Sequence, residues 1–503
     1  HKINAEPQHV NWHYPLSCEM VFLIPWHLGG IELAKLANIG FLLTLFLATG
    51  CLAGTVRPGA NGGWWAAFWL ASAGIMPDLC WQGKNDPGTA AFVTAAALCA
   101  ARGVQGPARW WPPAFWFLGC AVGAKLTAGF FAGGLAASAL ILERRRINVS
   151  LASLCAAAGA FPLAGWLIES LLFLGNPFYP FMSGLLPTLG WGPLYEDGLH
   201  RYVLIVSPPE TLRKIDMLTA VRRVFGDSGN GSPALLAVLP LAFLRPGGRT
   251  ANLLKAGALL VYLPWLATER GARFLLPLLP WIAAMAGSGT GPAMPRGSWG
   301  TLRAALAAAA FSMSLARIPT FAHLPNWMYL LGQTNREALF ANRFTTWDHA
   351  RLWVNRSLGA ADRVLFTGEA RRLWFKPRVI SSSPIAEPLF WKFSRESFTA
   401  GQMRKKLRER GITHFLHNIV AGEYRNVIWF SGPPWTVNQL EVYKDFMRLY
   451  ARPVYTPSRL DHLNGGFYIF ELSRRPDPKG FPLMFLPFTE AVFRNARVAR
   501  KLQ

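Results

Sequence analysis

The chain has 503 residues, with 51 Lys and Arg against 27 Asp and Glu, which gives a formal net charge of +24 at pH 7. Hydrophobic residues make up 52% of it, charged residues only 16%, and the mean hydropathy is +0.22. Long Ala, Leu and Gly runs with 21 Trp and 34 Phe exclude a nucleic-acid binder, a disordered chain and a disulfide scaffold. The composition indicates an integral membrane protein.

Apolar runs recur through the first two thirds of the chain, and a bilayer core needs about 20 apolar residues per helix. They predict about ten membrane helices, near residues 31–54, 64–81, 87–101, 110–123, 126–143, 150–173, 233–245, 252–267, 273–289 and 300–318. All six cysteines lie in the first third and none forms a Cys-x-x-Cys pair, so we expect buried free thiols.

Positive charge in the short connections predicts the orientation of these helices. One alternate set is Arg-rich and almost free of acids, and it contains Arg57, Arg102, Arg109, Arg144, Arg145, Arg146, Arg245, Arg249, Lys255, Arg296 and Arg303. Placing that set in the cytoplasm puts residues 1–30, 174–232 and everything after 319 outside. We therefore expect a multi-pass membrane protein whose functional face is extracytoplasmic.

The composition changes to mixed charge and short alternating segments after residue 340. Residues 363–367, 378–381, 413–418 and 466–472 are predicted strands, and residues 346–358 and 396–410 predicted helices, the second capped by Gly411. The predicted fold is mainly α, a polytopic transmembrane helical bundle (residues 1–340) followed by a small extracytoplasmic α/β domain (residues 341–503).

Lys84 and Asp86 lie just before Pro87, which starts a predicted helix at its outer end. A helix N-terminus attracts anions, and a lysine beside it is suited to phosphate, with Asp86 orienting Lys84 or acting near the acceptor. The alternative is a lysine that reaches the membrane surface while Asp86 caps the helix.

Three further cations are candidates for phosphate binding: Lys125, Arg270 and Arg273. Lys125 stands alone between two apolar stretches and needs an anionic partner or a route to water. Two arginines around one turn offer forked donors for phosphate, with Arg273 the deeper of the pair. Snorkelling of Lys125 and a salt-bridged interfacial anchor with Glu269 are the structural alternatives.

The long outer segment 174–232 carries aromatic side chains beside polar ones, at Tyr195, Glu196, Asp197 and His200. Ring faces and carboxylates suit sugar recognition, although interfacial aromatics are common in membrane proteins. A second polar group contains Glu6, His9, His13 and Glu19. Its spacing matches no strong metal motif, so no metal ligand is assigned.

The order of these features resembles the GT-C superfamily of polytopic glycosyltransferases, especially bacterial enzymes related to protein mannosyltransferases and aminoarabinose transferases. The similar motifs are Tyr14–Met20, Lys84-Asn85-Asp86, Gly123-Ala124-Lys125 with Gly129, Asn176–Pro180, Arg273–Pro277 and Val364–Glu369.

The resemblance implies sugar transfer from a polyprenyl-phosphate donor to an acceptor on the outer face of the membrane. In such enzymes a carboxylate in the first outer loop acts as general base, while cations hold the phosphate leaving group. In the family that loop would lie before His1, where upstream sequence would supply the acid; without it, Glu6 or Glu19 would have to substitute. Asp86 is the other candidate catalytic carboxylate. The resemblance also implies a location in the bacterial inner membrane, with the C-terminal domain in the periplasm. No soluble cofactor is implied, and dependence on a divalent metal is left open.

The expected partners are membrane lipids and a polyprenyl-phosphate sugar, with no nucleic acid. The alternative is a non-catalytic scaffold with a glycosyltransferase-like body, retained as a subunit of a larger membrane complex. Tryptophans near the predicted helices favour this alternative, since exposed aromatic stripes can contact partner helices; they are Trp64, Trp65, Trp69, Trp110, Trp111 and Trp116.

Overall fold

The structure is a computed structural model of residues 1–503. It describes residues 17–58, 62–73, 84–178, 247–267, 272–289, 345–367, 375–381, 389–418, 437–456 and 467–480, with short pieces at 239–240, 242–244, 312, 328–329, 331–335 and 337–338. The chain divides into two compact units, and the described residues up to 312 form a helical unit while those from 328 form an α/β unit. The predicted boundary at residue 340 lies outside the described residues.

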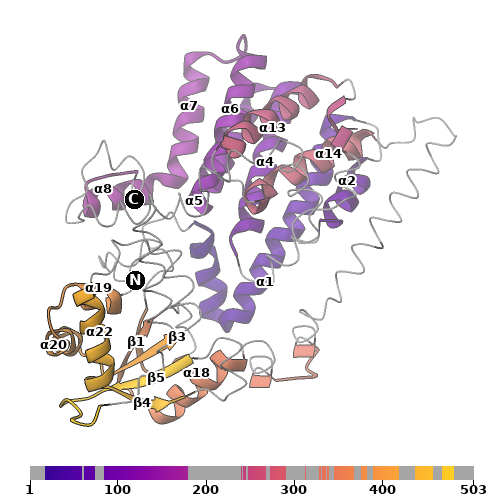
Figure 1. Ribbon diagram of the computed structural model, residues 1–503. Helices are drawn as coiled ribbons and strands as arrows, with labels where there is room; N and C mark the ends of the chain where they lie inside the picture. The colour runs from indigo at the N-terminus through magenta and orange to yellow at the C-terminus, as the bar shows by residue number, and fades with distance from the viewer. Residues whose placement is uncertain are drawn as a thin grey trace. The chain divides into compact units, whose positions relative to one another are not determined.

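The helical unit is built from apolar helices joined by short turns (Figure 1). Its helices are α1 (Ser17–Val56), α2 (Gly62–Ala71), α4 (Asp86–Gln105), α5 (Trp111–Ala124), α6 (Gly129–Glu143), α7 (Val149–Ala160), α8 (Ala164–Leu174), α13 (Arg249–Ala267) and α14 (Leu279–Gly289). Short 3-10 turns are η2 (Ala108–Trp110), η3 (Leu126–Ala128), η4 (Phe161–Leu163) and η6 (Ala272–Leu278).

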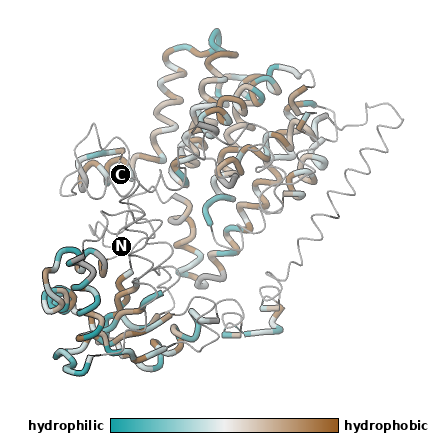
Figure 2. Tube along the Cα trace, in the orientation of Figure 1, coloured by the Kyte–Doolittle hydropathy of each residue, from teal (hydrophilic) through white to brown (hydrophobic). Residues whose placement is uncertain are grey.

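Four segments are long and apolar enough to cross a membrane: Leu33–Val56, Asp86–Gln105, Leu126–Glu143 and Val149–Leu172. Hydrophobic residues cover these helices, while the turn between α6 and α7 is hydrophilic (Figure 2). The described residues therefore support a membrane protein with fewer full-length spans than the ten predicted. The predicted span 300–318 lies outside the described residues except for residue 312, and 233–245 is described only in part.

Three predicted spans differ in detail from the structure. The 3-10 turn η4, which contains Pro162, interrupts the predicted helix 150–173 and divides it into α7 and α8. Helix α2 ends at Ala71, and residues 74–81 of that predicted span lie outside the described residues. Helix α1 begins earlier than predicted and consists of two arms joined at Gly29 and Gly30, where Gly30 adopts a positive φ of 72°.

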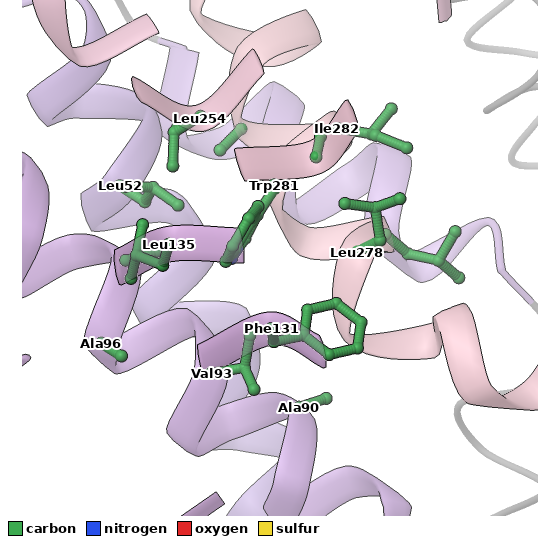
Figure 3. Close-up of a cluster of buried hydrophobic side chains, with 14 of the residues drawn as sticks. Leu52, Ala90, Val93, Ala96, Phe131, Leu135, Leu254, Leu278, Trp281 and Ile282 are labelled. Carbon is green, nitrogen blue, oxygen red and sulfur yellow. The ribbon is translucent and has the colours of Figure 1, made fainter. Parts of the chain in front are cut away.

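Helix α4 lies at the centre of the unit and packs on α1, α5 and the turn η6. Its alanines are small enough to let neighbouring helices approach on several sides, so it is buried over most of its length. Next to it, Phe131 of α6 meets Trp281 of α14 edge-on at 6.0 Å between ring centroids (Figure 3). Leu135, Leu254 and Leu278 complete this part of the core.

Glycines allow the closest helix contacts. A Cβ on Gly287 of α14 would lie 2.6 Å from the backbone nitrogen of Ala66 in α2. A Cβ on Gly119 of α5 would lie 2.1 Å from the carbonyl oxygen of Gly159 in α7. Both distances are too short for any side chain, so the helix pairs α2–α14 and α5–α7 require glycine at these positions.

Among the cysteines, the prediction of buried free thiols is wrong for Cys51. Cys18, Cys99 and Cys155 are free and buried, and Cys120 is free and half-buried. Cys51 is free but exposed on α1, in a span whose outer surface is apolar. Cys80 lies outside the described residues.

The α/β unit contains one five-stranded sheet with strand order β2-β1-β3-β5-β4. The strands are β1 (Arg363–Thr367), β2 (Arg378–Ile380), β3 (His414–Asn418), β4 (Ala451–Tyr455) and β5 (Phe467–Leu472). Strand β1 pairs in parallel with β2 and β3, while β5 is antiparallel to β3 and β4. The four predicted strands are present, and β4, which carries Pro453 at the sheet edge, was not predicted.

Helices cover both faces of this sheet (Figure 1). Helix α18 (Thr345–Ser357) packs on one face through Trp347, Ala350 and Val354. Helices α19 (Leu389–Arg395), α20 (Ala400–Glu409) and α22 (Val437–Tyr450) pack on the other. Gly411 follows α20 with a φ of 70°, and the Gly411 and Ile412 amides donate to the Arg408 and Leu407 carbonyls, as the predicted cap requires.

Candidate functional site

The start of α4 is fixed by hydrogen bonds to the helices on either side. Pro87 occupies one of the first helical positions, where its missing N–H costs nothing. The Asn85 side chain donates from Nδ2 to the carbonyl oxygen of Ala124 at the end of α5, at 2.8 Å. The Asn38 side chain of α1 donates to the carbonyl oxygen of Lys84 at 3.1 Å. Three helices therefore determine where Asp86 stands.

Lys125 enters this site because α5 stops one residue before it. Its backbone is extended, with φ −159° and ψ 118°, and separates α5 from the 3-10 turn η3. Lys125 Nζ lies 2.6 Å from Asp86 Oδ1, and the two side chains are only 17% and 3% exposed. The positive end of the α4 dipole also favours a carboxylate at Asp86. The predicted anionic partner of Lys125 is therefore Asp86.

An aromatic ring covers the lysine of this pair. Lys125 Nζ lies 4.3 Å from the ring centroid of Phe274, a geometry that favours a cation–π interaction. Phe274 belongs to η6, which packs on α4. A pocket opens at this contact, lined by Asp86, Thr89, Lys125, Thr127, Ala128, Phe131, Phe274 and Pro277.

The pocket combines one buried ion pair with hydroxyl and aromatic groups. A lysine ammonium carries three N–H donors, so Lys125 can contact an anion while it holds Asp86. Burial strengthens such a contact because little water screens it. Within the part of the chain that the structure describes, no group of three or more His, Cys, Asp or Glu side chains could hold a metal ion. The opening is only water-sized, so it admits at most one oxygen of a ligand such as a phosphate beside Lys125.

The structure brings together some of the residues singled out from the sequence. Asp86 and Lys125 are in direct contact, and the Lys84 main chain is part of the same junction. Arg273 lies in η6, directly before Phe274, although its side chain is outside the described residues. The segment containing Arg273 is thus anchored at Lys125 through its neighbour.

Glu19 lies in α1, and its side chain is outside the described residues. Its neighbour Cys18 is fully buried, and a Cβ on Gly88 would lie 2.7 Å from Cys18 Sγ. The start of α1, which carries Glu19, therefore packs against the first turn of α4. Arg270, Tyr195, Glu196, Asp197 and His200 lie outside the described residues, and their roles remain predictions.

Sequence reasoning gave no role to three groups of the site. Asn85 directly precedes the Asp-Pro pair that starts α4, and an Asn at that position predicts the start of a helix. Phe274 and Thr127 carry no such sign. Phe274 is 149 positions from Lys125, and only folding of η6 onto α4 reveals that its ring covers the ammonium group.

No protein-family model and no curated protein matches the chain. Solved structures do match its fold. The apo crystal structure of ArnT from Cupriavidus metallidurans gives a TM-score of 0.51 at 12% sequence identity, covering 91% of this chain and 87% of that one.

Two other solved structures give similar values. Arabinofuranosyltransferase AftD from Mycobacteria has a TM-score of 0.50 at 14% identity, over 93% of this chain and 36% of AftD. The Archaeoglobus fulgidus oligosaccharyltransferase tethered with an acceptor peptide has 0.50 at 12% identity, over 95% of this chain and 69% of that enzyme. All three are GT-C superfamily membrane glycosyltransferases. At these identities the likeness establishes the fold, and the GT-C resemblance seen in the sequence is confirmed at that level.

Proposed function

For a chain with this fold, we propose a membrane glycosyltransferase that moves a sugar from a polyprenyl-phosphate donor to an acceptor on the outer face of the bacterial inner membrane. The observation that carries the proposal is the buried Asp86–Lys125 pair, which lines a pocket together with residues of α4, η3, α6 and η6. Ionisable groups at membrane depth are costly and usually functional, and this pair holds a cation where a lipid phosphate would arrive.

In the proposed reaction an acceptor hydroxyl attacks the anomeric carbon of the donor sugar. A new carbon–oxygen bond forms there, and the bond from that carbon to the phosphate oxygen breaks. The electron pair leaves on the polyprenyl phosphate, and the acceptor proton passes to a carboxylate. Lys125 stabilises the negative charge that develops on the leaving phosphate.

The side chains divide into three proposed groups. Lys84, Lys125, Arg270 and Arg273 hold the donor phosphate, and Tyr195, Glu196, Asp197 and His200 bind the sugar or the acceptor. Between Glu19 and Asp86 as candidate bases, Glu19 is favoured, because the Asp86 carboxylate is already held by Lys125 in a 2.6 Å ion pair. Asp86 then positions Lys125.

Arginine-rich connections support the proposed orientation. Arg57, Arg109, Arg144, Arg145 and Arg249 belong to turns at the end of the bundle opposite Asp86. With that end in the cytoplasm, the pocket faces the periplasm. The periplasmic location of the α/β unit is proposed from the alternation of charged connections in the sequence alone.

The test is sugar transfer in proteoliposomes, with the full chain and a polyprenyl-phosphate sugar. Lys125→Met is expected to reduce kcat/KM by about 100-fold or more, a loss typical of removing one group that stabilises developing charge. Lys255→Met is the matched control, since Lys255 is a half-buried lysine on α13, towards the other end of the bundle. It is expected to keep wild-type turnover.

Two outcomes would contradict the proposal. Equal turnover by Lys125→Met and wild type would remove Lys125 from the site. Binding of polyprenyl phosphate without any transfer to a panel of acceptors would favour the scaffold subunit instead.

A further inference from the structure

All five strands of the α/β sheet meet at one edge whose connections are fully described. The parallel strands β1, β2 and β3 begin at this edge, β5 ends there, and β4 begins beside the end of β5. The segments that border the edge all belong to the described residues, and they are 357–363, 375–378, 408–414, 450–452 and 472–480.

Arginines from four separate parts of the unit collect at this edge. Arg363 begins β1 and Arg378 begins β2, and the register of the two strands puts these residues side by side. Two arginines of α20 and two that follow β5 join them. We call the set the arginine edge, which consists of Arg363, Arg378, Arg404, Arg408, Arg474 and Arg475.

Hydrogen bonds hold the two arginines of α20 against the segment that follows β5. Arg404 Nε donates to the carbonyl oxygen of Ser473 at 2.9 Å, and its Nη2 donates to that of Arg474. Arg408 Nη2 donates to the carbonyl oxygen of Leu472 at 2.8 Å. A guanidinium group carries five N–H donors, so both arginines keep donors for a further ligand.

The positive charges of the arginine edge repel one another. Burial lowers the pKa of Arg408, and the charges of Arg404 and Arg474 lower it further, while Glu471 acts in the opposite direction. Arg474 and Arg475 are exposed, and their side chains make no hydrogen bond or ion pair with the described residues. The edge therefore carries a positive field that an anionic partner would neutralise.

The acids near this edge do not neutralise it. Glu471 is paired with Arg452, and Glu409 lies 4.0 Å from Lys405. Asp362 accepts a hydrogen bond from a backbone amide of its own turn at 2.9 Å. Among the described residues, no acid forms an ion pair with a member of the arginine edge.

We propose that the arginine edge docks on a membrane surface that contains anionic phospholipids, with its guanidinium groups on the lipid phosphates. Arginine presents planar, forked donors that match the oxygens of a phosphate group. Anionic lipids attract clusters of basic residues through their surface potential. This role does not depend on the proposed transferase function.

The width of the edge favours a lipid surface over a single small anion. Five strands spaced about 4.8 Å apart form an edge about 20 Å wide. One phosphate ion can therefore contact only some of the six arginines, whereas several lipid headgroups can contact all of them at once. The α/β unit is also covalently joined to helices that can cross a membrane, which raises the effective concentration of lipid around it.

The test is hydrogen exchange of the full chain in nanodiscs. Exchange of the backbone amides in residues 473–477 is compared between discs of phosphatidylcholine and discs with equal parts of phosphatidylcholine and phosphatidylglycerol. In the wild type we expect exchange to be about threefold slower or more in the anionic discs, and high salt should remove the difference because it screens exposed charges.

Arg474→Gln/Arg475→Gln is the diagnostic variant. It removes two exposed charges that have no partner among the described residues, so the fold should be kept and exchange should become equal in the two kinds of disc. The ratio of the two exchange rates is taken within each variant, and the effect of the substitutions on intrinsic exchange therefore cancels.

Lys392→Gln/Lys444→Gln is the matched control. It removes the same charge from α19 and α22, where Glu396 lies 3.9 Å from Lys392 and Glu441 lies 2.8 Å from Lys444. This variant is expected to keep the wild-type difference between neutral and anionic discs.

The proposal is overturned if wild-type exchange is equal in both kinds of disc, or if Arg474→Gln/Arg475→Gln keeps the wild-type difference. It is also overturned if inorganic phosphate or a single-stranded oligonucleotide, rather than phosphatidylglycerol, causes the slowing that depends on Arg474 and Arg475. Loss of the difference in Lys392→Gln/Lys444→Gln would show a general effect of net charge and contradict a defined docking edge.

Discussion

The two ends of α4 each hold a buried carboxylate near a cation, yet they are built differently. At the amino end, Asp86 pairs with Lys125, which is 39 residues away and half covered by Phe274. At the carboxyl end, Glu143 of α6 pairs with Arg146, three residues along the same chain, at 3.5 Å. The first pair joins separate elements and lines a pocket. The second closes a helix end.

The carboxyl end of α4 is a structural junction. Arg146 donates from Nη1 to the carbonyl oxygen of Val104 at 2.8 Å. Gln105 donates from Nε2 to the Thr250 hydroxyl of α13 at 3.0 Å and also to the carbonyl oxygen of Thr55. These bonds satisfy the last carbonyls of helices and tie three of them together. Arg146 is 46% exposed, so its charge is largely in contact with solvent.

The difference supports the proposed role of the Asp86–Lys125 pair. The Glu143–Arg146 pair is local, and its arginine also satisfies the Val104 carbonyl, so a structural role accounts for it. A nearly buried ion pair between distant segments costs free energy to desolvate, and the attraction between its charges often does not offset that cost. We therefore assign Asp86 and Lys125 to the proposed ligand site, and Glu143 and Arg146 to helix packing.

The largest expected effect comes from breaking the functional pair. Lys125→Met leaves Asp86 buried without its cation, and such losses cost about 3–5 kcal/mol in stability. The double variant Asp86→Asn/Lys125→Met removes both charges and should recover most of that loss, without recovering transfer. Thermal denaturation in detergent and the transfer assay check the two parts. Recovery of transfer by the double variant would contradict the assignment.

The stability of the α/β unit is expected to depend on pH through a buried histidine, His417. The native His417 stays neutral down to a pKa of about 4, while the unfolded imidazole is protonated near pH 6.5. The unfolded state then binds more protons between these values, so the free energy of unfolding falls by about 3 kcal/mol as the pH drops from 6.5 to 4.

His417→Gln should flatten this slope. Burial also lowers the pKa of His414, so a smaller slope of the same sign should persist in the variant. Denaturation measured from pH 4 to 7 checks this, and an unchanged slope in His417→Gln would show that His417 is not buried neutral.

Phe274 sharpens the comparison at the functional end. Phe274→Leu keeps an apolar cover but removes the ring face, and a cation–π contact contributes about 0.5–2 kcal/mol. We expect KM for the lipid donor to rise about twofold to thirtyfold. Phe274→Tyr keeps a ring and should stay within about twofold of wild type. Equal KM values for the Leu and Tyr variants would show that the ring face has no role.

The smallest effect is expected at the structural end. Glu143→Gln removes the partner of an exposed arginine that keeps its bond to Val104, so stability should fall by about 1 kcal/mol or less. Transfer should stay within about twofold of wild type. A loss of transfer comparable to that of Lys125→Met would erase the distinction between the two ends of α4.

Much of this fold could be predicted from periodicity and breakers. The apolar runs predict α4, α5, α6 and α13, and Pro87 indicates where α4 begins. The alternating strands β1, β3 and β5 were found for the same reason. Edge strand β4 was missed because Pro453 argues against a strand, and α19 because seven residues carry too little periodic signal.

The candidate site could be predicted only in part. Lys125 needed an anionic partner because it stands alone among apolar residues, but the sequence could not name Asp86. That choice follows from the way Asn85 ties the start of α4 to Ala124, next to Lys125. The members of the arginine edge come from separate segments of the chain, and only the order of the strands shows that they lie together.

The central claim is that Lys125 binds the phosphate of a lipid carrier. The most direct measurement is the Kd of a polyprenyl phosphate for the full chain in nanodiscs, with the corresponding polyprenol as the ligand that lacks phosphate. We predict that Lys125→Met weakens polyprenyl phosphate at least tenfold, to the level of the polyprenol, while Glu143→Gln leaves it unchanged. Equal Kd values for wild type and Lys125→Met would contradict the account.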